Sequence, residues 1–352
     1  MSSRTSLEGQ DSALFNGKVG TTCSNREFHP DNISIGQSEP DSDGMWAFCR
    51  FDHSEILAVR VGFQKGGFNI TDSYLPINPS VLQLHLEIMT AEGGLVWLPT
   101  GVFHGEDVII EPDEINISLY SDSAEIFSIS GWPEMKWHFQ SLDESIEANL
   151  EFTIGNTTIL PDCILPYCTF AMWLGVSEVS GWVRIKNKTA EVKGTVFLDH
   201  PRIRHGLPAG NVRKSYLYTP LSLTDNSFFC CYYAEDQLGD PIPYYCFATY
   251  IDSDGEYFFS TGTELLTIEF DDNSLPKFWE LKWTDGNNSV HAKVSAKEHK
   301  LAKIWGSPDT PKSLKEFIYY PLVLDCSAVV TGKGKRKEVT GIGLAEYFKE
   351  GV

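Results

Sequence analysis

The sequence has no uninterrupted apolar run of about 18 residues, which is the length that a membrane-spanning helix requires. Its N-terminal segment, "MSSRTSLEGQDSALFNGKVG", also lacks the apolar core of a signal peptide. From these two absences we expect a protein without a membrane span that is located in the cytoplasm.

Positive charge is scarce. The chain has 28 Lys and Arg against 48 Asp and Glu, so its formal net charge is −20. Such a chain is repelled by a phosphate backbone, and nucleic acid is therefore not expected as a partner. The one basic run, Lys333–Lys337, lies between two strand-like segments and is interpreted as a hairpin loop.

Cysteine and the common cofactor motifs contribute little. Eight cysteines are too few and too irregularly spaced for a disulfide scaffold or a zinc ribbon. The sequence also has no glycine-rich phosphate loop, no G-x-S-x-G elbow, no H-E-x-x-H motif and no EF-hand loop. We therefore expect no metal, no nucleotide and no organic cofactor.

What the chain does have is hydrophobic alternation with a period of two. Residues 146–154 and 115–119 alternate apolar and polar side chains, and residues 180–185 and 190–198 flank a polar "KNKT" as a hairpin would. Helical periodicity is almost absent, and its best candidate is one short helix near Ser313. The pattern predicts an all-β protein of antiparallel strands.

The length of 352 residues suits two domains of ordinary size. Residues 1–24 are polar and without pattern, so we expect them to be disordered. Two glycines and a proline follow residue 205, which suggests a boundary at about residue 207. The prediction is two lipocalin-like β domains, barrels or sandwiches, covering residues 25–207 and 208–352.

The first candidate site is the segment "GTVFLDHPRIRHG", where charged residues end a strand-like run: Asp199, His200, Arg202 and Arg204. In that run Val196 and Leu198 lie on the apolar face, and Asp199 lies on the other face with Phe197. A turn that only bonds nearby backbone amides is one interpretation. The other is an acid/base cluster in which Asp199 pairs with an arginine inside an interdomain cavity.

Two further segments carry acid/base candidates. In "VLQLHLEIMT", His85 and Glu87 share one face, which is simply wet on an open sheet but lines the lumen of a barrel. In "GIGLAEYF", Glu346 shares a face with Leu344 and Phe348. Either the strand twists at its glycines, or a partner holds Glu346 inside.

Aromatic residues make up 12% of the chain, more than a plain core requires. Most are expected in the core, but some could line a cavity for an apolar ligand. The candidate substrate-binding residues are Trp46, Phe48, Arg50, Trp132, Trp137, Phe197, Tyr232 and Tyr233.

The segment from Gly194 to His200, a "GTVF" strand that leads into Asp-His at the end of a β-rich half, resembles the two-domain lipocalin-like superfamily of carotenoid hydratases and fungal Diels-Alderases. The early segment "DGMWAFCRFD…ILAVRVGFQKGG…LHLEIMTAEGG" is similar to the first strands of that family. The hydratase pattern His-Asp-His-Asn-Trp-Gly is not fully kept, because this chain has Leu198, Pro201 and Arg202 at three of its positions.

The resemblance implies a ligand cavity between or inside the two barrels, without metal or cofactor. The leading hypothesis is a cofactor-independent cyclase, either a Diels-Alderase-like pericyclase or an acid-initiated terpenoid cyclase, acting on a polyene or terpenoid natural-product intermediate as a monomer or homodimer. The alternatives are a hydratase that adds water to an isoprenoid double bond, a non-catalytic carrier of an apolar ligand and a purely structural module. A cavity lined by several of the acid/base groups would favour an enzyme, and a dry apolar pocket with those groups in solvent would favour a carrier.

Overall fold

The computed structural model describes residues 21–23, 42–52, 54–65, 82–92, 95–98, 102–103, 108–111, 116–121, 124–131, 134–141, 143–153, 157–165, 168–204, 215–236, 238–242, 246–260, 263–299 and 317–350. In these residues it contains strands and turns and no helix, and therefore no helix that could cross a membrane. The predicted all-β class is confirmed. Every strand pairing is antiparallel.

The first sheet has 14 strands in the order β5-β4-β3-β2-β14-β13-β11-β10-β9-β8-β7, with β12 on β13, β1 on β12 and β6 on β4. Its strands are β1 (Thr21–Cys23), β2 (Ser42–Phe51), β3 (Ile56–Lys65), β4 (Leu82–Thr90), β5 (Leu95–Leu98), β6 (Val102–Phe103), β7 (Val108–Glu111), β8 (Asn116–Ser121), β9 (Ala124–Ser130), β10 (Glu134–Gln140), β11 (Ile146–Thr153), β12 (Thr157–Leu165), β13 (Cys168–Ile185) and β14 (Lys188–Arg204).

The second sheet has nine strands in the order β18-β17-β16-β15-β23-β22-β21-β20-β19. They are β15 (Ser215–Leu223), β16 (Phe228–Glu235), β17 (Phe247–Ile251), β18 (Tyr257–Ser260), β19 (Thr263–Phe270), β20 (Pro276–Asp285), β21 (Asn288–His299), β22 (Phe317–Gly332) and β23 (Lys335–Glu350).

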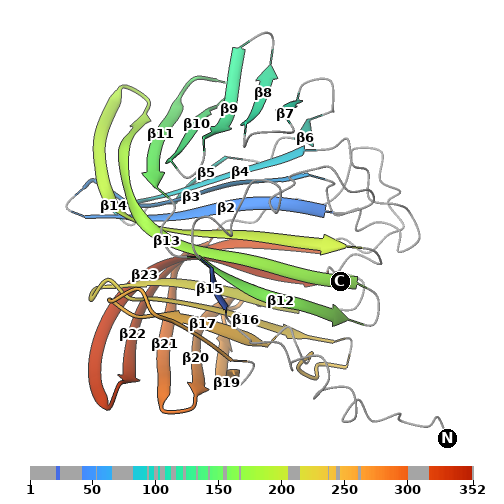
Figure 1. Ribbon diagram of the computed structural model, residues 1–352, viewed down its shortest axis with the longest axis vertical. Helices are drawn as coiled ribbons and strands as arrows, with labels where there is room; N and C mark the ends of the chain where they lie inside the picture. Colours follow the sequence, from blue (N-terminus) through green and yellow to red (C-terminus); the bar gives the residue numbers. More distant parts are fainter. Residues whose placement is uncertain are drawn as a thin grey trace, which may run out of the picture.

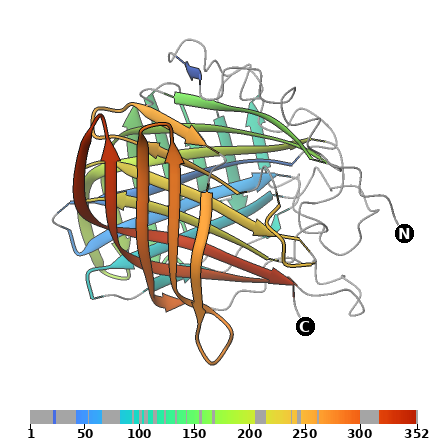
Figure 2. The ribbon, with the colours of Figure 1, turned by 90° about the horizontal axis from the view of Figure 1, so that it is seen from below.

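The two sheets curl into two β domains, which occupy the upper and lower parts of Figure 1. The predicted hairpin is confirmed, because β13 and β14 pair over their whole length around a turn at Lys186 and Asn187. The hairpin end of the two strands rises beside β11 in the upper domain, and their other ends run along the boundary between the domains (Figure 1). From below, the strands of the second sheet cross those of the first (Figure 2).

Two sequence-based expectations are tested at single segments. The basic run is the tip of the β22–β23 hairpin, as predicted, with positive φ at Lys333 and Gly334. The short helix near Ser313 was a wrong prediction for residues 317–320, which begin β22, because the aromatic and β-branched "FIYY" pairs with β23.

The N-terminal segment and the domain boundary are only partly covered. Residues 21–23 lie in the segment expected to be disordered, yet they form β1; the rest of residues 1–24 lies outside the described part of the chain. The boundary at residue 207 also lies outside it, between the end of β14 and the start of β15.

The interior consists of three clusters. A first core fills the concave side of the first sheet, around Trp137, Phe127 and Leu198, and a second core fills the second sheet, around Trp279 and Trp283. Between them lies a middle cluster with residues from both sheets: Phe48, Ala58, Met89, Phe197, Tyr218, Phe228, Cys230, Ala234, Phe247, Ile251, Val323 and Leu344. The two sheets therefore pack face to face through the middle cluster.

Candidate active site

The strand alternation sends one set of side chains into each core and the other set toward the opposite sheet. In β14, Val196 and Leu198 lie in the first core, as predicted, and Phe197 lies in the middle cluster. In β4, Leu86 and Ile88 lie in the first core, whereas Met89 lies in the middle cluster. The face of β4 that carries Glu87 is thus neither wet nor a barrel lumen, because it is covered by the second sheet.

Strand register then sets polar residues side by side on this covered face. Phe48 pairs with Arg60, and Arg60 pairs with Glu87. Two residues further along the strands, Asp199 pairs with Trp46. Two charged strand positions and a buried aspartate therefore lie next to each other where the sheets meet.

Arg60 forms one ion pair within its own sheet and one with the other sheet. Its Nη1 lies 3.6 Å from Oε2 of Glu87, and its Nη2 forms a close ion pair with Oε1 of Glu346 on β23. The side chains of Arg60, Glu87 and Glu346 are 4%, 0% and 11% exposed. Charges taken out of water at this depth are tolerated only when they are paired.

Two aromatic rings flank the same guanidinium. Cζ of Arg60 lies 4.9 Å from the ring centroid of Trp46 and 5.6 Å from that of Tyr218. Gly62 makes room for the indole, because a methyl group on its Cα would lie 2.4 Å from Cε3 of Trp46. The faces of both rings are attracted to the cation and hold it in place.

Two tyrosines of β15 each donate a hydrogen bond to a carboxylate. The hydroxyl of Tyr218 donates to Oδ2 of Asp199 at 2.7 Å, and that of Tyr216 donates to Glu346. Burial and, after it, the charge of Asp199 raise the pKa of Tyr218 well above its usual range. The hydroxyl of Tyr218 therefore stays protonated and remains the donor of this hydrogen bond.

These six residues are called the polar cluster: Arg60, Glu87, Asp199, Tyr216, Tyr218 and Glu346. It places carboxylates, phenols and one guanidinium in a buried environment where electrostatic interactions are strong. Such an arrangement can move a proton and stabilise developing charge on an apolar molecule. Buried ionisable groups that gather in one place are a signal of a functional site.

Several predicted site residues come together here. Glu87, Asp199 and Glu346 belong to the polar cluster. Of the two interpretations offered for Glu346, a strand twist or a partner in the interior, the structure has the second, because Arg60 and Tyr216 bind its carboxylate. Among the predicted substrate-binding residues, those beside the polar cluster or in the middle cluster are Trp46, Phe48, Phe197 and Tyr232.

Sequence reasoning missed Arg60, Tyr216 and Tyr218. A signal for Arg60 was present, because "ILAVRVGF" puts one arginine into an otherwise apolar strand, in the same way as the glutamate of "GIGLAEYF". The two tyrosines gave no such signal, since tyrosine is common in strands that are half buried.

Three predicted residues lie elsewhere. Trp137 packs in the first core, with ring centroids 5.9 Å from Phe152. Tyr233 points to the opposite face of β16 from Tyr232, and burial, followed by the thiol of Cys246, raises its pKa to about 12. Arg50 donates a 2.8 Å hydrogen bond to the carbonyl of Leu223 and so ties the two sheets at one end of their contact.

The side chains of the other candidates lie outside the described residues: His85, Trp132, His200, Arg202 and Arg204. β14 pairs with β13 without a register shift past Asp199. Arg202 and Arg204 therefore belong to the same series of alternate backbone positions as Leu198, and Asp199 belongs to the other series. The predicted pairing of Asp199 with either arginine stays a prediction.

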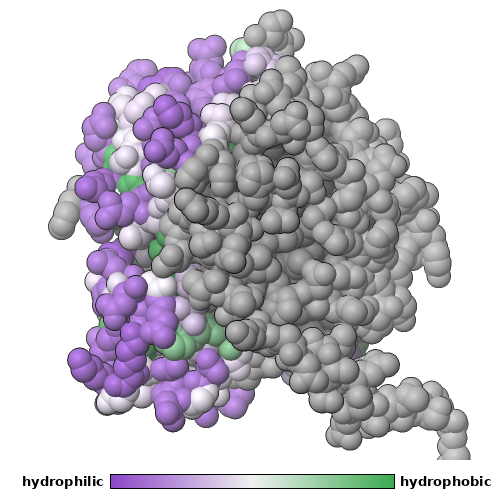
Figure 3. All heavy atoms as spheres, viewed as in Figure 1, coloured by the Kyte–Doolittle hydropathy of each residue, from purple (hydrophilic) through white to green (hydrophobic). Residues whose placement is uncertain are grey.

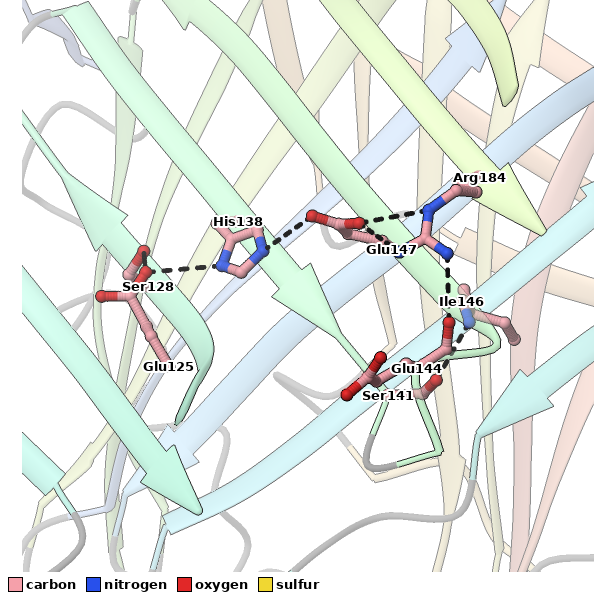
Figure 4. Close-up of polar contacts among 8 residues, drawn as sticks. All are labelled: Glu125, Ser128, His138, Ser141, Glu144, Ile146, Glu147 and Arg184. Atoms are coloured by element: carbon pink, nitrogen blue, oxygen red, sulfur yellow. Dashed lines mark hydrogen bonds and ion pairs between the residues drawn. The ribbon is translucent and has the colours of Figure 1, made fainter. Parts of the chain in front are cut away.

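A second group of charges lies on the outside of the first sheet (Figure 4). His138 lies between two glutamates, with Nδ1 3.4 Å from Glu125 and Nε2 3.4 Å from Glu147. Arg184 donates from Nε to Glu147 at 3.2 Å and from Nη1 to the carbonyl of Glu144 at 3.2 Å. We call Glu125, His138, Glu147 and Arg184 the outer charge chain.

Within the described residues, no group of three or more His, Cys, Asp or Glu side chains is arranged to hold a metal ion. The described atoms visible on the left of Figure 3 are mostly hydrophilic. Among the described residues, the large apolar side chains that are exposed are Leu238, Leu266 and Phe270.

The fold defines the class of protein: it is the two-domain lipocalin-like fold, and the predicted resemblance is confirmed at that level. No protein-family model matches the sequence, and no curated protein matches it significantly.

Solved structures with this fold are similar over nearly the whole chain. An AttH protein from Nitrosomonas europaea has a TM-score of 0.61 at 11% identity, over 95% of this chain and 98% of its own. Kievitone hydratase from Nectria haematococca has a TM-score of 0.58 at 11% identity, over 95% of this chain and 94% of its own. CghA has a TM-score of 0.48 at 11% identity, over 88% of both chains.

Proposed function

We propose that this protein is an enzyme that acts on an apolar polyene or terpenoid molecule by proton transfer, at the polar cluster between its two β domains and without an organic cofactor. Of the activities considered, an acid-initiated cyclase fits these residues best. The single observation that carries the proposal is the burial of three carboxylates with one arginine and two tyrosines between two sheets. Apolar residues would hold two sheets together at lower cost.

The carboxylates of the polar cluster and the neighbouring aromatic rings have separate roles in this chemistry. In this proposal the Asp199 carboxylate first takes up a proton from water and then gives it to an alkene carbon, and the π electrons of the double bond form the new C–H bond. The cation that results is stabilised by the carboxylates and by the aromatic faces of Trp46 and Tyr218. A second double bond of the substrate attacks the cation and closes the ring. Loss of a neighbouring proton to a carboxylate then gives a neutral product.

Hydration is the second candidate function. The same protonated alkene gives an alcohol when water attacks the cation and one water proton is lost. Kievitone hydratase, which shares the fold, supports keeping this candidate. A pericyclic reaction needs no proton transfer, so the polar cluster gives it less support. A carrier would bind the ligand and return it unchanged.

The test is turnover in D2O with farnesol, geranylgeraniol and a prenylated phenol as probes. Acid-initiated cyclisation places one deuterium on carbon, and hydration adds an oxygen that H2¹⁸O labels. A pericyclic product carries no deuterium, and a carrier gives no product. Either of the last two outcomes contradicts the proposal.

The matched variant is Asp199→Asn. Because the change is isosteric and Asn still accepts the hydrogen bond of Tyr218, the melting temperature should stay unchanged while turnover falls by about 100-fold or more. Asp325→Asn is the control, since Asp325 is 43% exposed, pairs with Lys297 and lies outside the polar cluster. Undiminished turnover of a folded Asp199→Asn variant removes Asp199 from the mechanism.

A further inference from the structure

Asp199 is the acid of the proposed reaction, and its surroundings set how readily it gives up a proton. Only 3% of the residue is exposed, so water has little part in this. The residues that pair with it in register are Leu174 on β13 and Trp46 on β2, and neither carries an ionisable group. The strength of the acid therefore depends on groups that reach it from further strands.

The second sheet presents two phenols and a thiol to Asp199. The hydroxyl of Tyr218 on β15 donates a hydrogen bond to its Oδ2 at 2.7 Å. On the neighbouring strand β16, burial and, after it, the charge of Asp199 raise the pKa of the Cys230 thiol and that of the Tyr232 hydroxyl well above their usual ranges. All three groups therefore stay protonated beside the aspartate.

The charges of the polar cluster also lie close to Tyr218. Arg60 on β3 pairs with Glu87 on β4 and with Glu346 on β23, and its Cζ lies 5.6 Å from the ring centroid of Tyr218. Glu346 is also the register partner of Tyr218. A change that removes only the hydroxyl of Tyr218 leaves these charges in place, so its effect on Asp199 can be separated from theirs.

Cys230 holds the hydroxyl of Tyr218 in its orientation. The register of β15 on β16 places Cys230 opposite Pro220, two residues from Tyr218, and both side chains lie in the middle cluster. The thiol forms a hydrogen bond with the side chain of Tyr218. Because the hydroxyl proton already points at Asp199, the hydroxyl oxygen accepts this bond and the thiol donates it. Two linked hydrogen bonds thus lead to the aspartate, and each polarises the next.

We infer that the hydroxyl of Tyr218 makes Asp199 a stronger acid, and that Cys230 is the positioning residue that aims this hydroxyl. The inference rests on the proposed function for the role of Asp199. A hydrogen bond donated to a carboxylate stabilises its ionised form, so the protonated form gives up its proton more readily. Transfer of a proton to an alkene needs a strong acid, because the product is a carbocation.

The test measures the titration of Asp199 by infrared difference spectroscopy. A protonated carboxyl group has a C=O stretch, and the band of Asp199 is the one that Asp199→Asn removes. Tyr218→Phe keeps the ring and loses the hydroxyl, so the pH midpoint of this band should rise by about one unit. Cys230→Ala should raise the midpoint by less, and Cys230→Ser, which keeps a donor, should restore it.

Tyr216→Phe is the matched control for Tyr218→Phe. Tyr216 lies two residues earlier on β15, and its hydroxyl donates to Glu346 instead. The midpoint of the Asp199 band should therefore move much less than in Tyr218→Phe. Equal shifts in the two variants would mean that the loss of either phenol has the same effect, which overturns the inference.

Cys231→Ala is the control for Cys230→Ala, because Cys231 is the next residue of β16 and equally buried but lies in the second core. It should leave the midpoint unchanged. An unchanged midpoint in folded Tyr218→Phe overturns the inference, and so does a shift in Cys230→Ala that Cys230→Ser does not reverse. A wild type whose band never appears while the protein is folded overturns it too. The readout needs no substrate, so these results are independent of the turnover test with Asp199→Asn.

Discussion

Two groups of paired charges in this protein have similar chemistry and very different surroundings. The polar cluster pairs Arg60 with two glutamates whose side chains are 0% and 11% exposed. The outer charge chain pairs Arg184 with Glu147, and those side chains are 30% and 21% exposed. Water can replace a lost partner in the outer chain but not in the polar cluster. The comparison teaches that burial, rather than the pairing itself, marks a group of charges as a functional candidate.

The largest effect is expected from Arg60→Met. It leaves Glu87 and Glu346 buried without their cation, so the free energy of unfolding should fall by about 3–5 kcal/mol. Urea unfolding measures the change. A loss below about 1 kcal/mol would mean that removing a charge partner costs no more in the polar cluster than in an exposed pair, which would contradict the comparison.

Gly62→Val tests the support behind Arg60. The added side chain would overlap the indole of Trp46, which must move away from the guanidinium, at a cost of about 1–3 kcal/mol. Thermal unfolding measures the cost. The control is Gly332→Ala, where the nearest atom to an added methyl group is Oδ1 of Asn288 at 3.4 Å. Equal effects at both glycines would contradict the close contact with Trp46.

Arg184→Met is the counterpart of Arg60→Met in the outer charge chain. Because water solvates the glutamate that loses its partner, the free energy of unfolding should fall by at most about 1 kcal/mol. The difference from wild type should shrink further at high salt, because salt screens exposed charges. A loss of several kcal/mol that salt does not change would mean that the outer charge chain depends on its ion pair as strongly as the polar cluster does.

The smallest effect is expected at Asp143, in the turn that carries Glu144. Hydrogen bonds from the side chains of Ser141 and Ser145 lower the pKa of Asp143 to about 2, from the usual 3.8. The lowered pKa stabilises the folded state above about pH 4, and this contribution is lost as the pH falls toward 2. Asn does not titrate, so the difference in the free energy of unfolding between Asp143→Asn and wild type should become smaller as the pH falls over that range. A difference in the free energy of unfolding that stays constant with pH would contradict the lowered pKa of Asp143.

In β4 and β14 the alternation of residues in the sequence was enough to predict which face of the strand a residue occupies. It separated Leu198 from Asp199 and Leu86 from Glu87 as the structure has them. Periodicity is local, however, and does not say which two faces will meet. That Glu87, Asp199 and Glu346 share one cluster follows from the packing of one sheet on the other, which no local pattern encodes.

The aromatic residues of β16 show a strand in which alternation could not assign the faces. In β16 the residues from Phe228 to Cys231 are all buried, since one face of the strand lies in the second core and the other in the middle cluster. A strand buried on both faces has no alternation, so the sequence could not separate Tyr232 from Tyr233. Trp137 shows a different limit: it lies in the first core, and bulky aromatic side chains suit a core and a ligand site equally.

The middle cluster also has a consequence for folding. Each sheet covers an apolar face of the other, so either domain folded alone would expose residues such as Phe197 or Phe228 to water. The two domains are therefore expected to stabilise each other and to unfold as one cooperative unit, with a single calorimetric transition. A mutation in either half then lowers the melting temperature of both, and the polar cluster forms only when the two halves have docked.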